Sequence, residues 1–376
     1  MPLSTSQRIA FLDWLRGLAA VIMLQGHTFD AFASPEARRG SAFIFSQFFG
    51  GEAAAIFLLL TGVTYGLGMN RREHLPAWSR VTAALKRARY LFLLAIVFRV
   101  QNWAFSYPKS SLADLLKVDV LNLMGVMAAA LALLALARGL DRVRWAAGAG
   151  VAIAALSPVI SALPAGLLPQ TLVDYVAPSG TMFSIFPWGA YFAFGCAAGS
   201  MIPLVERGAW NRVMQWSAMC GFGLVFAGRY FSDLPYSIYT SSDFWLNSPA
   251  LVACKLGVAM LLGAGAYLWT EYLSTGWSWV RQLGTTSLFV YWAHVALDYG
   301  RLFERYHQRL NALACVVASV ALIPAMVGGS VLFRRIVWSE IPLRLMRWWK
   351  GTRTAPAPVY VLEPHEADAR ASRKRA

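Results

Sequence analysis

About ten stretches of roughly twenty apolar residues follow one another along this chain, and each is long enough to cross a bilayer as a helix. Of the 376 residues, 57% are hydrophobic and only 14% are charged, whereas a soluble domain carries about 25% charged residues. The pattern predicts an all-α fold, a polytopic integral membrane bundle of about ten transmembrane helices. We expect the spans near residues 9–31, 48–69, 87–105, 119–138, 145–163, 182–202, 212–231, 248–270, 284–302 and 312–334.

Loop charges predict which side of the membrane each loop occupies. Residues 70–89 are strongly basic, whereas residues 161–180 and 232–247 contain no Lys or Arg. Because cytoplasmic loops carry the excess of Lys and Arg, both termini are expected in the cytoplasm. One loop disagrees: residues 301–310 carry three arginines but fall on the outer side.

This topology predicts three parts of the chain. They are a short cytoplasmic N-terminus at 1–8, a transmembrane domain at 9–335 and a basic, partly disordered cytoplasmic tail at 336–376. The net charge of +15 lies mainly in loops and tail, which favours contact with anionic membrane lipid and argues against nucleic-acid binding. The expected location is a bacterial cytoplasmic (inner) membrane, and the oligomeric state stays open.

The first apolar stretch contains two polar residues whose burial in lipid is unfavourable, Arg16 and His27. Ionisable residues inside a membrane span are by default functional candidates. Eleven helical steps bring both side chains to nearly the same face, roughly 16 Å apart along the axis. Asp13 and Asp30 extend this stripe. The structural alternatives are a hydrogen bond from His27 that fixes helix register, and an Arg16 that reaches the interface.

Further polar residues fall in the outer half of the predicted bundle, where they would line a cavity open to the outside. They are Glu52, Asn102, Asn122, Tyr291, His294 and Asp298. A histidine can accept a proton from a hydroxyl or an amine near neutral pH. For His294 a purely structural role is about equally well supported.

Other site classes lack their sequence signals. The four cysteines lie in apolar segments without CxxC spacing, so we expect no metal site. The chain contains no GxSxG, Walker A, GxGxxG or HExxH motif, which argues against the usual hydrolases, NTPases, dinucleotide-binding enzymes and zincins.

The segment LDWLRGLAAVIMLQGHTFD resembles the opening helix of the transmembrane acyltransferase superfamily. This superfamily includes acyltransferase-3 proteins and the catalytic domain of heparan-α-glucosaminide N-acetyltransferase. The shared motif is Asp-x-x-Arg-Gly followed by a histidine, and this sequence matches it with Asp13, Arg16, Gly17 and His27. Softer similarity is seen in AIFLLLTGVTYGLGMNRR, IFPWGAYFAFGCAAG and TTSLFVYWAHVALDYG.

The resemblance implies a bundle of ten to eleven spans that moves acyl groups from cytoplasmic acyl-CoA to sugars across the membrane. It also implies that His27 is the catalytic histidine and Arg16 its essential partner. We expect acetyl-CoA, or another acyl-CoA, as co-substrate and a sugar or glycan as acceptor. The donor's anionic nucleotide would dock among basic residues of the cytoplasmic face, namely Arg16, Lys86, Arg87, Arg89 and Arg281.

His27 would then act as general base or as acyl carrier. The imidazole would be oriented by a carboxylate from Asp30, Glu52 or Asp298. The developing oxyanion would receive a hydrogen bond from Asn102, Asn122 or Tyr291. Two other functions stay open, a transporter or flippase with a polar cavity and a non-catalytic membrane assembly protein.

Overall fold

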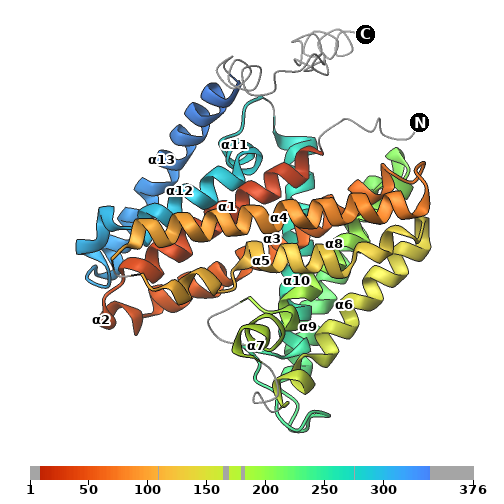
Figure 1. Ribbon diagram of the computed structural model, residues 1–376, viewed down its shortest axis with the longest axis horizontal. Helices are drawn as coiled ribbons and strands as arrows, with labels where there is room; N and C mark the ends of the chain where they lie inside the picture. The colour runs from red at the N-terminus through yellow and green to blue at the C-terminus, as the bar shows by residue number, and fades with distance from the viewer. Residues whose placement is uncertain (1–8, 109, 164–168, 179–182, 275, 339–376) are drawn as a thin grey trace. The chain divides into compact units, whose positions relative to one another are not determined.

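A computed structural model describes residues 9–108, 110–163, 169–178, 183–274 and 276–338. The predicted N-terminus at 1–8 and nearly all of the predicted tail lie outside these residues. Within them the fold is all helical, and the one β-type contact is an isolated bridge between Ala33 and Leu310 (Figure 1). Contacts divide the chain into residues 1–331 and 332–376; the last turns of α13 are the described part of the second unit.

Each predicted span overlaps one principal helix, in the predicted order, although α3 and α4 begin seven and ten residues before the predicted spans. These helices are α1 (Ala10–Phe32), α3 (Ser41–Asn70), α4 (Ala77–Ser106), α5 (Val120–Ala130), α6 (Gly139–Ser161), α8 (Ile185–Met201), α9 (Trp210–Ser232), α10 (Pro249–Leu268), α12 (Ser287–Asp298) and α13 (Ala312–Trp338). Shorter helices are α2 (Pro35–Arg38), α7 (Gln170–Val176) and α11 (Trp279–Thr285).

Five helical segments of the described chain are long and apolar enough to cross a membrane. They are Ser41–Asn70, Gly139–Ser161, Ile185–Leu204, Pro249–Leu273 and Ala312–Ile336. The all-α membrane fold is therefore confirmed, whereas the count of about ten crossings and the side of the termini stay predictions. Many large apolar side chains on the helices are exposed, such as Phe45, Trp145 and Phe226, as expected where lipid is the solvent.

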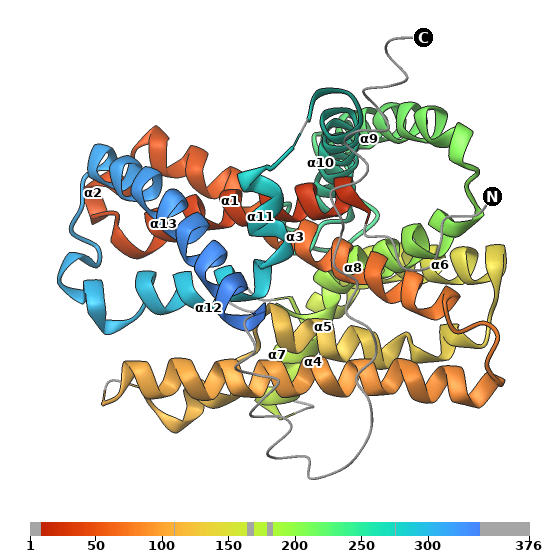
Figure 2. The same ribbon diagram turned by 90° about the horizontal axis from the view of Figure 1, so that it is seen from above.

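Helix α1 packs against α3, α10, α11 and α12 (Figure 2). Its crossing with α11 brings the two backbones into contact at Gly17 and Gly284. A Cβ on Gly17 would lie 1.8 Å from the carbonyl oxygen of Val280, and a Cβ on Gly284 would lie 1.8 Å from that of Asp13. No side chain larger than hydrogen fits at this crossing. The glycine that follows Arg16 is therefore a packing residue.

A second close crossing joins α3 and α8. A Cβ on Gly62 would lie 2.1 Å from the carbonyl oxygen of Phe192, and one on Gly199 would lie 2.0 Å from that of Val63. Small residues four apart let membrane helices approach this closely. The glycines of TGVTYGLG therefore serve helix packing.

The predicted single span at 284–302 is wrong in one respect, because the chain breaks there into α11 and α12. Thr286 has φ −117° and ψ 22°, outside helical geometry. The hydroxyls of Thr285 and Thr286 both donate to the carbonyl oxygen of Gln282, at 2.9 Å. Such local side-chain bonds compete with a continuous helix. The break gives α12, which carries His294, a direction of its own.

Candidate functional site

The two intramembrane histidines meet directly, although 267 positions separate them. Nδ1 of His27 on α1 lies 2.8 Å from Nε2 of His294 on α12. The rings are stacked, with centroids 5.0 Å apart and planes 19° apart. His294 is fully buried and His27 is half-buried. The direct hydrogen-bond partner of His27 is thus a second imidazole, and the orienting carboxylate stays a prediction.

The hydrogen bonds of His294 assign the tautomers of the pair. Its Nδ1 lies 2.8 Å from the carbonyl oxygen of Val290, which can only accept, so this nitrogen carries the hydrogen. In a neutral ring Nε2 is then bare and accepts from Nδ1–H of His27. The Nε2 of a neutral His27 is consequently unprotonated. This is the state that a base or a nucleophile needs.

Asp30 reaches His27 through a tyrosine that the sequence analysis did not select. The Tyr299 ring packs edge-on against His27, with centroids 5.7 Å apart, and its hydroxyl donates to Asp30 at 2.7 Å. The carboxylate also forms an ion pair with Arg38 at 3.7 Å. Nothing in the sequence pairs these residues, because Arg38 ends the short helix α2 and Tyr299 follows the last residue of α12, far along the chain.

The loop at 301–311 is fixed to the same end of α1. Backbone hydrogen bonds join Gln308 to Ala31, Leu310 to Phe32, and Ser34 to Leu310, at 2.8–3.1 Å. The three arginines that disagreed with the charge rule therefore lie in a loop beside the His27 end.

Tyr291 and Asn122 lie in a neighbouring polar group. Tyr291 packs edge-on against His294, with centroids 5.8 Å apart, and also contacts Phe98. Asp119 caps α5 by accepting from the backbone of Asn122 at 2.9 Å and pairs with Arg99 at 3.2 Å. The side chain of Asn122 donates to a tyrosine hydroxyl at 3.1 Å.

Asn102 and Asp298 are less engaged. Asn102 is half-buried near the end of α4, and no hydrogen bond joins its side chain to a described residue. Asp298 on α12 is 2% exposed, and one of its carboxylate oxygens has no hydrogen-bond partner among the described residues.

Glu52 is held by a lysine that the sequence analysis missed. Lys255 on α10 lies 3.2 Å from Glu52 and donates to the carbonyl oxygen of Gly51 at 2.8 Å. Both charged side chains are 9% exposed. The rule that selected Arg16 also applies to Lys255, which stands inside the apolar run PALVACKLGV.

The other end of α1 opens onto a cavity. Arg16 pairs with Asp13 at 3.2 Å, and both line a cavity of about 230 Å³ together with Thr64, Arg71 and Thr285. Arg71 was not among the predicted donor residues.

The predicted basic set does not gather at one place. Arg87 lines a second cavity, described below, whereas Lys86, Arg89 and Arg281 are exposed and line neither. Among the described residues no three His, Cys, Asp or Glu side chains are arranged to hold a metal ion.

Comparison with known families places this geometry in context. Residues 8–242 match the family described as heparan-alpha-glucosaminide N-acetyltransferase, catalytic. The match includes α1 to α9, and with them Asp13, Arg16 and His27, whereas His294 and Lys255 lie beyond it. Compared with curated proteins, the chain matches none. Since the family match covers more than half of the chain, the protein belongs to the heparan-alpha-glucosaminide N-acetyltransferase catalytic domain family, and it is a membrane acetyltransferase.

Proposed function

We propose that the protein transfers an acyl group, in the first instance acetyl, from cytoplasmic acyl-CoA to a hydroxyl or amine of an extracytoplasmic sugar or glycan. The bacterial inner membrane is the proposed location. The Arg16 end of α1 is taken as cytoplasmic because the basic segment 70–89, which comprises the link after α3 and the start of α4, lies at that end.

One observation carries the proposal. The bare Nε2 of His27 results from a fixed chain of hydrogen bonds that runs from the Val290 carbonyl through His294. The same hydrogen bond to His294 also fixes the register of α1 against α12, and it leaves the second ring nitrogen of His27 free to react. The arrangement supports His27 as the group that handles protons or the acyl group, with His294 as its positioning residue.

In direct transfer the acceptor hydroxyl or amine gives its proton to Nε2 of His27. The acceptor oxygen or nitrogen attacks the thioester carbonyl carbon, the C–S bond breaks, and the leaving thiolate of CoA takes up the proton from His27. In the alternative, Nε2 itself attacks the carbonyl carbon and the C–S bond breaks to release the CoA thiolate. The acceptor oxygen or nitrogen then takes the acyl group from the imidazole, and the proton that the acceptor loses balances the proton that the thiolate takes up. Either route balances with the donor and acceptor alone.

The donor is proposed to enter at the cavity beside Arg16 and Asp13. From there a long thin donor arm would run along the α1 stripe for roughly 16 Å to reach His27. Tyr291, which packs edge-on against His294, or Asn122 would donate a hydrogen bond to the developing oxyanion.

The test follows CoA release from acetyl-CoA with a panel of sugars, using purified wild type, His27→Ala and His294→Ala. We expect His27→Ala to lose transfer by about 10²- to 10⁴-fold. His294→Ala should lower kcat more than KM and shift the pH profile, because the tautomer of His27 is no longer fixed. Full activity in His27→Ala would refute the mechanism. Sugar movement across vesicles without CoA release would support a transporter instead.

Acyl-enzyme trapped on wild type, together with ping-pong kinetics, would select the acyl-histidine route. Strictly sequential kinetics would select direct transfer.

A further inference from the structure

Arg80 on α4 is a buried cation that forms no ion pair with any residue that the structure describes. Its side chain is 5% exposed, and Nη2 donates to the carbonyl oxygen of Leu136 at 3.4 Å. Nε and Nη1 have no hydrogen-bond partner among the described residues. An arginine keeps its charge in a protein, so burial without a paired anion is unfavourable.

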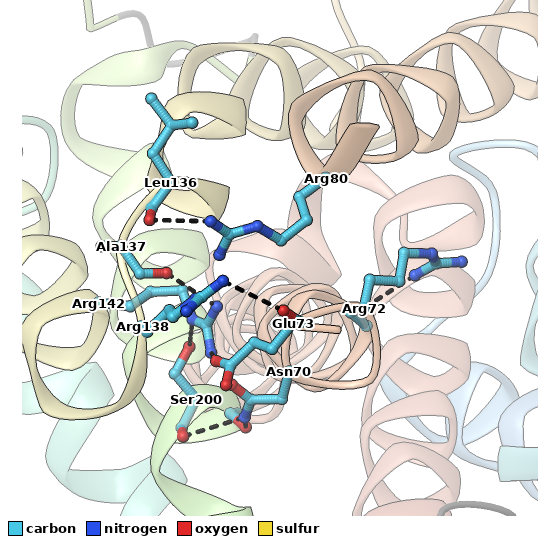
Figure 3. A network of polar contacts seen from close by, with 11 residues as sticks. Asn70, Arg72, Glu73, Arg80, Leu136, Ala137, Arg138, Arg142 and Ser200 are labelled. Atoms are coloured by element: carbon cyan, nitrogen blue, oxygen red, sulfur yellow. Dashed lines mark hydrogen bonds and ion pairs between the residues drawn. The ribbon is translucent and has the colours of Figure 1, made fainter. Parts of the chain in front are cut away.

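The nearby carboxylate is already occupied (Figure 3). Glu73 forms an ion pair with Arg142 at 2.5 Å, and Arg142 is fully buried and also donates to Ser200 at 3.1 Å. The backbone carbonyl of Glu73 accepts from Arg138 at 3.4 Å. Within this network of arginines, Glu73 therefore neutralises Arg142 and leaves Arg80 unpaired.

Arg80 lines a cavity of about 220 Å³ between α3 and α4, together with Arg72 and Arg87. Arg72 and Arg87 are exposed, so a ligand could reach them from solvent. The volume is below the roughly 300–1,000 Å³ of pockets that enclose a drug-sized ligand, so the cavity suits one group of a larger molecule. Three guanidinium groups around a small space favour an anion with several acceptor oxygens.

The excess of Lys and Arg in cytoplasmic loops does not account for Arg80. That rule concerns basic residues of loops, which keep their charge in water. Arg80 has given up most of its contact with water, and a bound anion would compensate for this loss.

We propose that this cavity binds a phosphate ester through Arg72, Arg80 and Arg87. The cavity shares Thr64 with the cavity beside Arg16. The source of the ester is assigned from the proposed function, on which this step rests: the ester belongs to the nucleotide of the acyl-CoA donor. A phospholipid headgroup is the other source of the same chemistry.

The experiment uses the full chain in nanodiscs of neutral lipid and measures CoA binding by titration calorimetry. Arg80→Gln should bind CoA roughly ten- to a hundredfold more weakly than wild type, the range of a lost charge-assisted contact. Arg72→Gln, at an exposed position, should show a weaker loss without risk to folding. Arg144→Gln is the matched control, because Arg144 is 75% exposed and pairs with Asp141 at the surface.

A second arm measures thermal stabilisation by inorganic pyrophosphate and by nanodiscs that contain phosphatidic acid. Loss of CoA binding in Arg80→Gln and Arg72→Gln, but not in Arg144→Gln, supports the site with the donor as its source. Unchanged CoA binding with lost stabilisation by phosphatidic acid supports the site with lipid as its source. If no phosphate ester distinguishes Arg80→Gln from wild type, the proposal is overturned.

Acyl transfer by the wild type is measured separately. CoA binding through Arg80 without any transfer would refute the proposed function and leave this site standing. Acyl transfer by the wild type, with Arg80→Gln matching the wild type in both binding arms, would support the proposed function and overturn this site.

Discussion

The two ends of α1 carry similar polar residues in different surroundings. At the N-terminal end, Asp13 and Arg16 pair with each other and face a cavity of about 230 Å³. At the C-terminal end, His27 is bonded to another helix, and neither of the two cavities described above includes it. One end of the stripe is open to a ligand, and the other is fixed in advance by tertiary contacts. On the proposed function, the difference separates a surface that recognises the donor from a group prepared for chemistry.

The largest expected effect tests what keeps the two ends in register. Gly17→Ala places a methyl group against the Val280 carbonyl, at 1.8 Å, so α1 and α11 must separate. We expect a loss of about 3 kcal/mol or more in the free energy of unfolding, measured by thermal or denaturant unfolding in detergent. Gly148→Ala is the control, because a Cβ there meets nothing within 4 Å. Equal stability of the two variants would contradict the close crossing.

The next effect tests whether the His27 half of the bundle is held by buried paired charges. Lys255→Met leaves Glu52 buried without its partner, at an expected cost of about 3 kcal/mol in unfolding free energy, the lower end of the range for a broken buried pair. The double variant Glu52→Gln with Lys255→Met should recover most of this loss. At the open end, Asp13→Asn should cost less, because the Arg16 side chain is 21% exposed and lines a cavity, so its charge keeps contact with solvent when the carboxylate is removed. Similar losses at both ends would remove the contrast.

The smallest effect tests the open end by kinetics. Arg16→Gln should raise KM for acetyl-CoA about tenfold, or about 1.4 kcal/mol, with kcat nearly unchanged. The reason is that Arg16 contacts the donor cavity and not the reacting atoms. Initial rates over a range of donor concentrations measure both constants. A fall in kcat with an unchanged KM would assign Arg16 to the chemical step and break the comparison.

The positions of the helices could be predicted from the sequence because apolar length reports directly on membrane burial. The break at Thr286 could not, since two hydroxyl bonds to one carbonyl leave no mark on hydropathy. Both histidines were selected by their cost in an apolar segment, but their pairing depends on how α12 docks on α1. No local pattern encodes that contact.

Basic residues were the least well predicted. The arginines near α3 and α4 were interpreted as topology signals, so Arg71, Arg72 and Arg80 were not chosen as ligand contacts. Burial separates Arg80 from its solvated neighbours, and burial of a single side chain is a tertiary property. Lys255 differs, because its position inside an apolar run is visible in the sequence. Ionisable residues inside a membrane span are functional candidates, and Lys255 meets this criterion as Arg16 does.

The crossing of α1 with α11 has a consequence for distances within the protein. Gly284 rests on the backbone of α1, and the next residue, Thr285, lines the cavity beside Arg16. Ten positions after Gly284, His294 meets His27. The distance between the cavity and the histidine pair therefore depends on Gly17 and Gly284, whose side chains are only hydrogen atoms. A single methyl group added at either position would change that distance.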